Sequence, residues 1–292
     1  MKPVDFDYFD PATVDEALAL LANHGDDGKA LAGGQSLVPL LNLRLARPKV
    51  LVDLNRIASL AYVRERNGGL AIGAMTRQRV VETSDLVRSR CPLLAEATTL
   101  IGHPTIRNRG TVGGSLAHAD PASELPAALL ALGGEVAARS RAGERVIPAK
   151  EFFRGHLTTA LRPGELLAEI RLPAMPAGAG WAFEELARRH GDFAVVGVAA
   201  VVVPDGSGRV KSAALALIGV GGAAFRAAQA EQALVGRSLD DGAMRDAGRL
   251  AAQAARPESD VHAPAEYRTA MVEVFVRRAL GRAWSRIKGV GA

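Results

Sequence analysis

The stretch that decides the fold is Ala32-Gly33-Gly34-Gln35-Ser36-Leu37, a glycine turn that follows a short apolar segment at 29–32. The apolar run Val38 to Leu45 comes directly after it. Glycine has no Cβ and tolerates a positive φ, so such a turn lets backbone N–H groups approach an anion closely. Taken alone, the turn is equally consistent with a tight connection between a strand and a helix.

A second glycine turn, Gly110-Thr111-Val112-Gly113-Gly114-Ser115, lies far downstream. It also combines paired glycines with hydroxyl side chains, and neither turn carries a side chain suited to acid–base work. We predict that the two turns lie together and that their N–H groups and hydroxyls hold one diphosphate. Neither turn matches G-x-G-x-x-G or a P-loop, so those two nucleotide-binding motifs are excluded.

The composition is that of a globular chain with room for one large or two to three small domains. Its 292 residues are 48% hydrophobic and carry a net charge of +5, but the basic residues are interspersed, so no nucleic-acid binding is expected. The single cysteine, Cys91, and six unpaired histidines predict no disulfide and no metal site. No apolar run reaches the roughly 18 residues of a membrane span. With no apolar signal region at the N-terminus, we expect a cytoplasmic protein.

Changes in composition divide the chain into three regions, 1–57, 58–176 and 177–292. The first reads as a strand, a helix that starts at Asp10-Pro11 and a β-turn-α-β unit with strands at 29–32 and 50–54 and a helix at 38–45. In the second we expect hairpins at 62–73 and 135–148, helices at 76–84, 89–100 and 121–132, a polar loop at 102–114 and a strand at 166–172. Asp120, before Pro121, is the expected cap of the third helix.

The third region follows a linker rich in proline and glycine at 173–180. Two strongly apolar runs, 194–204 and 210–220, flank Asp205-Gly206-Ser207-Gly208 and predict an antiparallel pair of strands. Three helices are expected after them, at 224–234, 240–255 and 264–286.

Both glycine turns belong to longer motifs that resemble a known family. Residues 32–46 (AGGQSLVPLLNLRLA) and 105–115 (TIRNRGTVGGS) resemble the two FAD-binding motifs of the medium subunit of molybdenum hydroxylases, a family that includes the carbon monoxide dehydrogenase medium chain and the flavin domain of xanthine dehydrogenase. The segments 164–167, 186–194 and 265–268 extend the resemblance over essentially the whole chain. It implies an α+β fold, in which a small α/β lobe and a larger antiparallel-sheet lobe bind FAD. A C-terminal domain of a three-stranded antiparallel sheet with helices then closes over the flavin.

The resemblance also implies FAD as the cofactor and assigns roles to residues. The two turns would hold the diphosphate: Ala32, Gly33, Gly34, Gln35, Ser36 and Leu37, with Gly110, Thr111, Val112, Gly113, Gly114 and Ser115. Ile101 would line the adenosine side, Ser123 and Glu124 the ribityl or ring side, Leu166 and Leu167 the surroundings of flavin and adenine, and Phe193 the isoalloxazine. Plain core packing is the alternative for Leu166, Leu167 and Phe193. No catalytic side chain is expected, because the flavin carries the hard chemistry.

Two positions depart from the family pattern. Gln35 stands where many members have histidine, and it offers hydrogen bonds but no titratable group. Glu185 stands where many members have lysine, so this position cannot supply a cationic contact to the flavin edge. Arg188 or Arg189 would supply that contact instead.

The resemblance further implies partner chains. An iron–sulfur cluster needs about four ligands, and this chain has one cysteine, so its electrons must come from elsewhere. The expected partners are a small subunit with two [2Fe–2S] clusters and a molybdopterin-containing large subunit, assembled as a dimer of heterotrimers, a heterohexamer. Electrons would leave through FAD to an external acceptor, and the substrate would bind the large subunit. A stand-alone FAD-dependent oxidoreductase and a flavin-free scaffold subunit are the alternatives.

Overall fold

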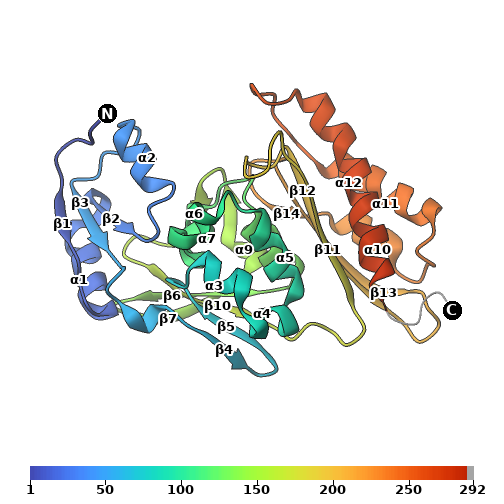
Figure 1. Ribbon diagram of the computed structural model, residues 1–292, viewed down its shortest axis with the longest axis horizontal. Helices are drawn as coiled ribbons and strands as arrows, with labels where there is room; N and C mark the ends of the chain where they lie inside the picture. The colour runs from blue at the N-terminus through green and yellow to red at the C-terminus, as the bar shows by residue number, and fades with distance from the viewer. Residues whose placement is uncertain (288–292) are drawn as a thin grey trace.

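The computed structural model describes residues 1–287, which form three units in chain order along the long axis of the molecule (Figure 1). We call them the N-terminal lobe (β1 to β3), the middle lobe (β4 to β10) and the C-terminal domain (β11 to α12). Each has its own sheet, and the β8–β9 pair is a fourth, two-stranded sheet. The α+β fold class predicted from the sequence is confirmed. None of the described helices has the length and apolar character needed to cross a membrane.

The N-terminal lobe is a parallel three-stranded sheet with the order β1-β3-β2. Thr13 and Glu16 form a capping box at α1, so the helix begins at Val14 and not at Asp10 as predicted. The predicted 38–45 helix also ends early, because Arg44 adopts a φ of 58°. The elements are β1 (Asp7–Phe9), α1 (Val14–His24), β2 (Gly28–Leu31), α2 (Leu37–Asn42) and β3 (Val50–Asp53).

The middle lobe is built on a five-stranded antiparallel sheet with the order β4-β5-β10-β6-β7. Both predicted hairpins and the predicted strand at 166–172 are confirmed. The strands are β4 (Val63–Arg66), β5 (Gly69–Gly73), β6 (Glu135–Ser140), β7 (Gly143–Pro148) and β10 (Leu166–Leu172), beside the small pair β8 (Phe153–Gly155) and β9 (Thr158–Thr159). The helices are α3 (Gln78–Thr83), α4 (Asp85–Arg90), α5 (Pro92–Leu100), α6 (Pro104–Arg109), α7 (Val112–His118), α8 (Glu124–Ala131) and α9 (Ala149–Phe152).

Three predictions for the helices of this lobe need correction. The expected 89–100 helix is confirmed over 92–100 as α5, but it begins at Pro92, which has no N–H to continue α4 past Cys91. The expected polar loop at 102–114 contains α6 and the start of α7. Helix α8 begins at Glu124 with Ser123 at the cap position, so Asp120 is not its cap. The Asp120 carboxylate instead accepts from the Ala122 N–H (2.9 Å) in the turn before the helix.

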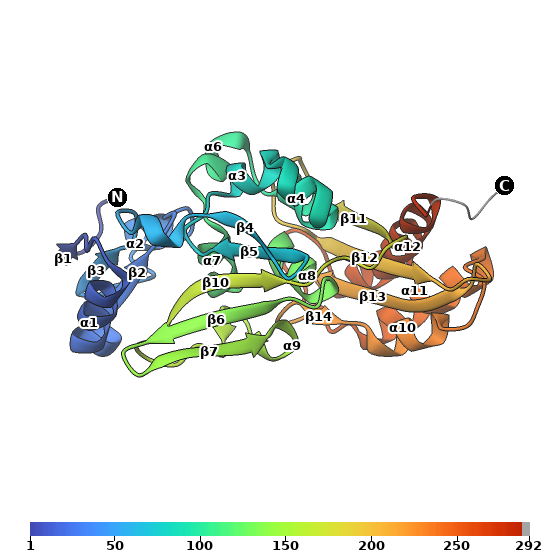
Figure 2. The same cartoon turned by 90° about the horizontal axis from the view of Figure 1, so that it is seen from below.

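The C-terminal domain has three long antiparallel strands, as predicted, and a fourth of two residues. Its sheet lies between the helices of the middle lobe and α10 to α12 (Figures 1 and 2). Helices α5 and α8 contact this sheet, so the two units share one hydrophobic core. The elements are β11 (Gly180–Leu186), β12 (Val196–Pro204), β13 (Val210–Ile218), β14 (Phe225–Arg226), α10 (Ala228–Leu234), α11 (Asp241–Ala254) and α12 (Ala265–Ser285).

Candidate functional site

The first glycine turn presents a row of unused backbone donors. It connects β2 to α2, and Gly34 adopts a φ of 74°, which favours glycine. The N–H groups of residues 33–37 have no acceptor among residues 1–287. The Gln35 side chain donates to the Gly33 carbonyl (3.1 Å) and so folds back onto the turn. A row of five neighbouring free N–H groups is suited to binding an anion.

The second turn lies against the first, as predicted. A Cβ placed on Gly33 would come within 2.5 Å of the Arg109 carbonyl oxygen and 2.8 Å of the Gly110 Cα. A Cβ on Gly114 would lie 3.2 Å from the Ala32 Cβ. Glycine is therefore required at Gly33 because the backbone of the other turn occupies the space of a side chain.

Most N–H groups of the second turn are already used within the protein. Val112 donates to the Thr76 carbonyl (3.0 Å) and Gly113 to the Ala74 carbonyl (2.8 Å). Gly114 donates to the Thr111 hydroxyl (3.1 Å), which caps α7. The N–H groups of Val112, Gly113 and Gly114 are thus engaged within the protein, and the bonds of Val112 and Gly113 hold the second turn onto the middle lobe.

Two residues that the sequence interpretation missed connect the turns. Asn55, just after β3, donates from Nδ2 to the Ala32 carbonyl (2.9 Å). Arg77, just before α3, donates to Asn55 Oδ1 (2.7 Å) and to the Arg109 carbonyl (2.6 Å). No sequence motif marks either residue, although a polar residue at the carboxyl end of a parallel strand is a weak signal for a binding site.

Arg107, from the basic part of the second motif, has a structural role. Arg107 is 4% exposed, and its guanidinium forms a two-pronged ion pair with Glu82, at 2.8 and 3.1 Å. It also donates to the carbonyl of Ile101 (2.9 Å), a buried residue at the end of α5. The guanidinium holds the pKa of Glu82 below its usual value. Arg109, by contrast, is exposed beside the two turns.

A further polar group consists of two hydroxyls, one of which is on the last residue of the second turn, and two carboxyls. Ser115 on α7 and Ser123 before α8 share a hydrogen bond of 3.0 Å. Glu124 is 3% exposed, and burial, together with the charge of Glu185, raises its pKa to about 8. Burial raises the pKa of Glu185 on β11 to about 7, and its buried Oε2 atom has no hydrogen-bond partner among residues 1–287. These side chains lie at the seam between α8 and the C-terminal domain.

The remaining predicted site residues occupy different surroundings. Leu166 and Leu167, on β10, are 6% and 4% exposed and belong to the hydrophobic clusters of the N-terminal and middle lobes, respectively. Phe193 is 60% exposed, in the segment between β11 and β12. Arg188 and Arg189, in the same segment, both pair with Asp192. Phe193 is therefore outside the core, whereas the two leucines pack within it.

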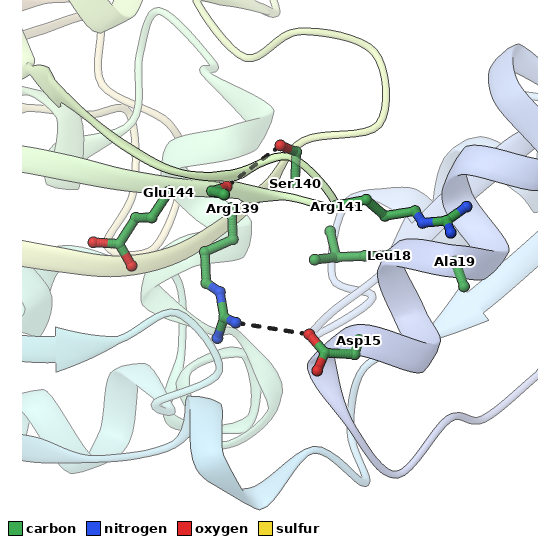
Figure 3. A pocket seen from close by; sticks show the side chains of 8 residues that line it. Asp15, Leu18, Ala19, Arg139, Ser140, Arg141 and Glu144 are labelled. Atoms are coloured by element: carbon green, nitrogen blue, oxygen red, sulfur yellow. Dashed lines mark hydrogen bonds and ion pairs between the residues drawn. The ribbon is translucent and has the colours of Figure 1, made fainter.

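An open groove of about 590 Å³ lies elsewhere, between α1 and the β6–β7 turn (Figure 3). Asp15 and Arg139 face each other across it at 3.7 Å. No predicted site residue lines this groove, and nothing in its lining matches the turn chemistry. Among the described residues, no group of three or more metal-ligating side chains is present.

The glycine turns fit an extended dianionic ligand. The free N–H row supplies donors, Arg77 and Arg109 supply positive charge, and the first turn contains no carboxylate to repel a phosphate. Such an arrangement is suited to binding and orienting a phosphate-bearing cofactor. The fold and the site thus define a cofactor-binding α+β protein.

Comparison with known proteins identifies the family. Residues 4–175 match the model of the FAD binding domain in molybdopterin dehydrogenase, and residues 181–283 match the C-terminal domain of the CO dehydrogenase flavoprotein. The alpha subunit of the 6-hydroxypseudooxynicotine dehydrogenase complex of Paenarthrobacter nicotinovorans is 46% identical over 99% of this chain and 97% of its own. The carbon monoxide dehydrogenase medium chain of Afipia carboxidovorans is 41% identical, over 99% and 100%.

A solved structure agrees with these matches. Carbon monoxide dehydrogenase from Hydrogenophaga pseudoflava contains a chain with a TM-score of 0.96 and 43% identity, covering 98% of this chain and 100% of that one. The chain belongs to the family of FAD-binding medium subunits of molybdenum hydroxylases, which are oxidoreductases with several subunits. Its cofactor is FAD, as the sequence motifs predicted.

Proposed function

We propose that this chain is the electron-transfer subunit of a molybdenum hydroxylase and passes electrons from a partner's iron–sulfur clusters through FAD to an external acceptor. The observation that carries the proposal is the contact between the two glycine turns, with five free N–H donors on the first. When bound, FAD supplies the electron-transfer chemistry. The full-length match to medium subunits favours this role over a stand-alone oxidoreductase.

The residues of the site would divide the work of holding FAD. The first turn would bind the diphosphate through its N–H groups, and the second turn would support it from behind. Ser115 and Ser123 would offer hydroxyls to the ribityl side, and the exposed ring of Phe193 would cover the isoalloxazine. The full set that we propose is Ala32, Gly33, Gly34, Gln35, Ser36, Leu37, Ile101, Gly110, Thr111, Val112, Gly113, Gly114, Ser115, Ser123, Glu124, Leu166, Leu167 and Phe193.

The electrons would come from a partner, because Cys91 is buried and is the only cysteine of the chain. We propose a small subunit with two [2Fe–2S] clusters and a molybdopterin-containing large subunit, assembled as a dimer of heterotrimers in the cytoplasm. We also propose the domain division 1–57, 58–176 and 177–292, which the separate sheets support. The substrate would be chosen by the large subunit.

Titration of the purified full chain with FAD tests cofactor binding. We expect wild type to bind FAD, and Gly33→Val to lose it, because the new side chain would push the two turns apart. Gly206→Val is the matched control, since no atom lies within 4 Å of a Cβ at that glycine. Equal FAD binding by the two variants would contradict the proposed site.

Co-purification tests the partners. A tagged chain should bring down proteins that contain iron, acid-labile sulfide and molybdenum. A flavin-loaded chain that purifies alone would instead favour the stand-alone oxidoreductase. A metal-containing complex without flavin would favour a scaffold.

A further inference from the structure

We propose that Asn55 and Arg77 form a strap that positions the two glycine turns around the FAD diphosphate. This inference rests on the proposed function and extends it to two residues outside both motifs. The strap is defined as the side chains of Asn55 and Arg77 with the carbonyls of Ala32 and Arg109 that accept their hydrogen bonds.

The strap is a continuous series of three hydrogen bonds. Asn55 donates to the Ala32 carbonyl at 2.9 Å, Arg77 donates to Asn55 Oδ1 at 2.7 Å, and Arg77 donates to the Arg109 carbonyl at 2.6 Å. Ala32 opens the first turn, and Arg109 directly precedes the second. The Asn55 backbone is itself fixed, because its N–H donates to the Asp53 carboxylate (2.8 Å).

The bonds join two different lobes. Ala32 and Asn55 follow the neighbouring strands β2 and β3 of the N-terminal lobe, whereas Arg77 and Arg109 belong to the middle lobe. The turns otherwise meet through small residues at Gly33, Gly110 and Gly114, which allow close approach but fix no lateral position. Directional hydrogen bonds are what set such a position.

Arg77 also brings an unpaired positive charge to this junction. The guanidinium is half-buried and forms no ion pair among residues 1–287. Two of its N–H groups are used in the strap, and the other three have no acceptor in that part of the chain. Burial lowers the pKa of Arg77, the neighbouring charge of Arg109 adds to this effect, and Asp53 acts in the opposite sense. Guanidinium groups are suited to phosphate oxygens because they are always charged and offer several donors.

Calorimetric titration of the full chain with FAD, and separately with ADP, tests the strap. Arg77→Met should weaken both affinities by about 10- to 100-fold, because a charge-assisted hydrogen bond and the position of the turns are lost together. Arg56→Met is the matched control: Arg56 adjoins Asn55 and pairs with Asp10 (3.0 Å) but touches neither turn. It should leave both affinities within about twofold of wild type.

A double-mutant cycle separates positioning from general stability. Asn55→Ala should also weaken FAD binding. Its effect on the affinity should be smaller in the Arg77→Met background than in wild type, because Arg77→Met has already removed the strap's hydrogen bonds to Asn55 and Arg109. The dependence of the ADP affinity on salt should weaken in Arg77→Met and not in Arg56→Met. Arg77→Lys, which keeps the charge, should recover part of the affinity, and it also serves if the methionine variant does not fold.

The outcomes distinguish the strap from the proposed function. Wild type that fails to bind FAD would overturn the proposed function, and the strap's role with it. Wild type that binds FAD, beside an Arg77→Met variant that binds equally well, would overturn the strap alone. Strictly additive losses in the cycle, or equal losses in Arg56→Met, would do the same.

Discussion

The buried carboxyl of Glu124 should make the stability of this chain depend on pH. The carboxyl lies at the start of α8 and is 3% exposed. Burial raises its pKa first, the charges of Glu185 on β11 and Asp120 before α8 add to the effect, and Arg107 opposes it. The result is a rise from 4.5 to about 8. In the unfolded chain the carboxyl returns to its ordinary pKa, so unfolding releases a proton throughout this range.

The sign follows from that release. A group whose pKa is higher in the folded state contributes stability that is fully present below pH 4.5 and is lost as the pH rises through about 8. Each pH unit in this window lowers the free energy of unfolding by about 1.4 kcal/mol for one proton. Over the window the loss reaches about 5 kcal/mol, a large share of the stability of a typical domain.

Urea unfolding of the FAD-free full chain, followed by circular dichroism at several pH values between 5 and 8, measures this dependence. Glu124→Gln keeps the volume of the side chain and cannot ionise. The free energy of unfolding of this variant should therefore fall with pH less steeply than that of wild type, with slopes that differ by about 1.4 kcal/mol per pH unit. Above pH 8 the variant should be more stable than wild type. Glu151→Gln, at an exposed carboxylate, is the control and should retain the wild-type slope. A Glu124→Gln slope equal to that of wild type would refute the reasoning.

Three other predictions follow from the contacts of single residues. Glu82→Gln should lower the free energy of unfolding in urea by about 3 kcal/mol, because it leaves the buried Arg107 charge without its carboxylate; an unchanged value would contradict the role of this pair. Cys91, fully buried and with its pKa raised to about 12 by burial, should not react with iodoacetamide at pH 8 until urea unfolds the chain; rapid labelling of the folded chain would show that the thiol is accessible. Gly33→Val should remove FAD absorbance from the purified chain while Gly206→Val keeps it, as a visible spectrum of each variant will show.

Local patterns predicted most elements of the fold. The Asn67-Gly68 hairpin and the strand at 166–172 follow from alternation and turn residues, which act within a few positions along the chain. One error falls where a distant contact decides the structure. The segment at 102–114 was expected to be a loop because it is polar, yet α6 forms there with Arg107 buried against Glu82, a partner from α3. The polarity of the segment does not indicate that Arg107 will pair with a residue from α3.

The diphosphate site was likewise predicted in part from local sequence. The glycines of both turns were identified from the sequence, because glycine is the residue that allows another group to approach the backbone of a turn closely. The sequence did not show which group approaches each glycine. Gly33 is required by the backbone of the other turn, and a row of five neighbouring free N–H donors lies on the first turn.

The sequence by itself determined that two glycine turns, in this order and with these flanking motifs, belong to an FAD-binding chain. The tertiary structure alone decided that Asn55 and Arg77 bridge those turns and that Glu124 lies buried near a second carboxyl. The physical reason is the distance along the chain over which each interaction acts. Turn and strand preferences act between neighbours, whereas hydrogen bonds between lobes and the burial of a charge depend on segments that meet only when the chain is folded.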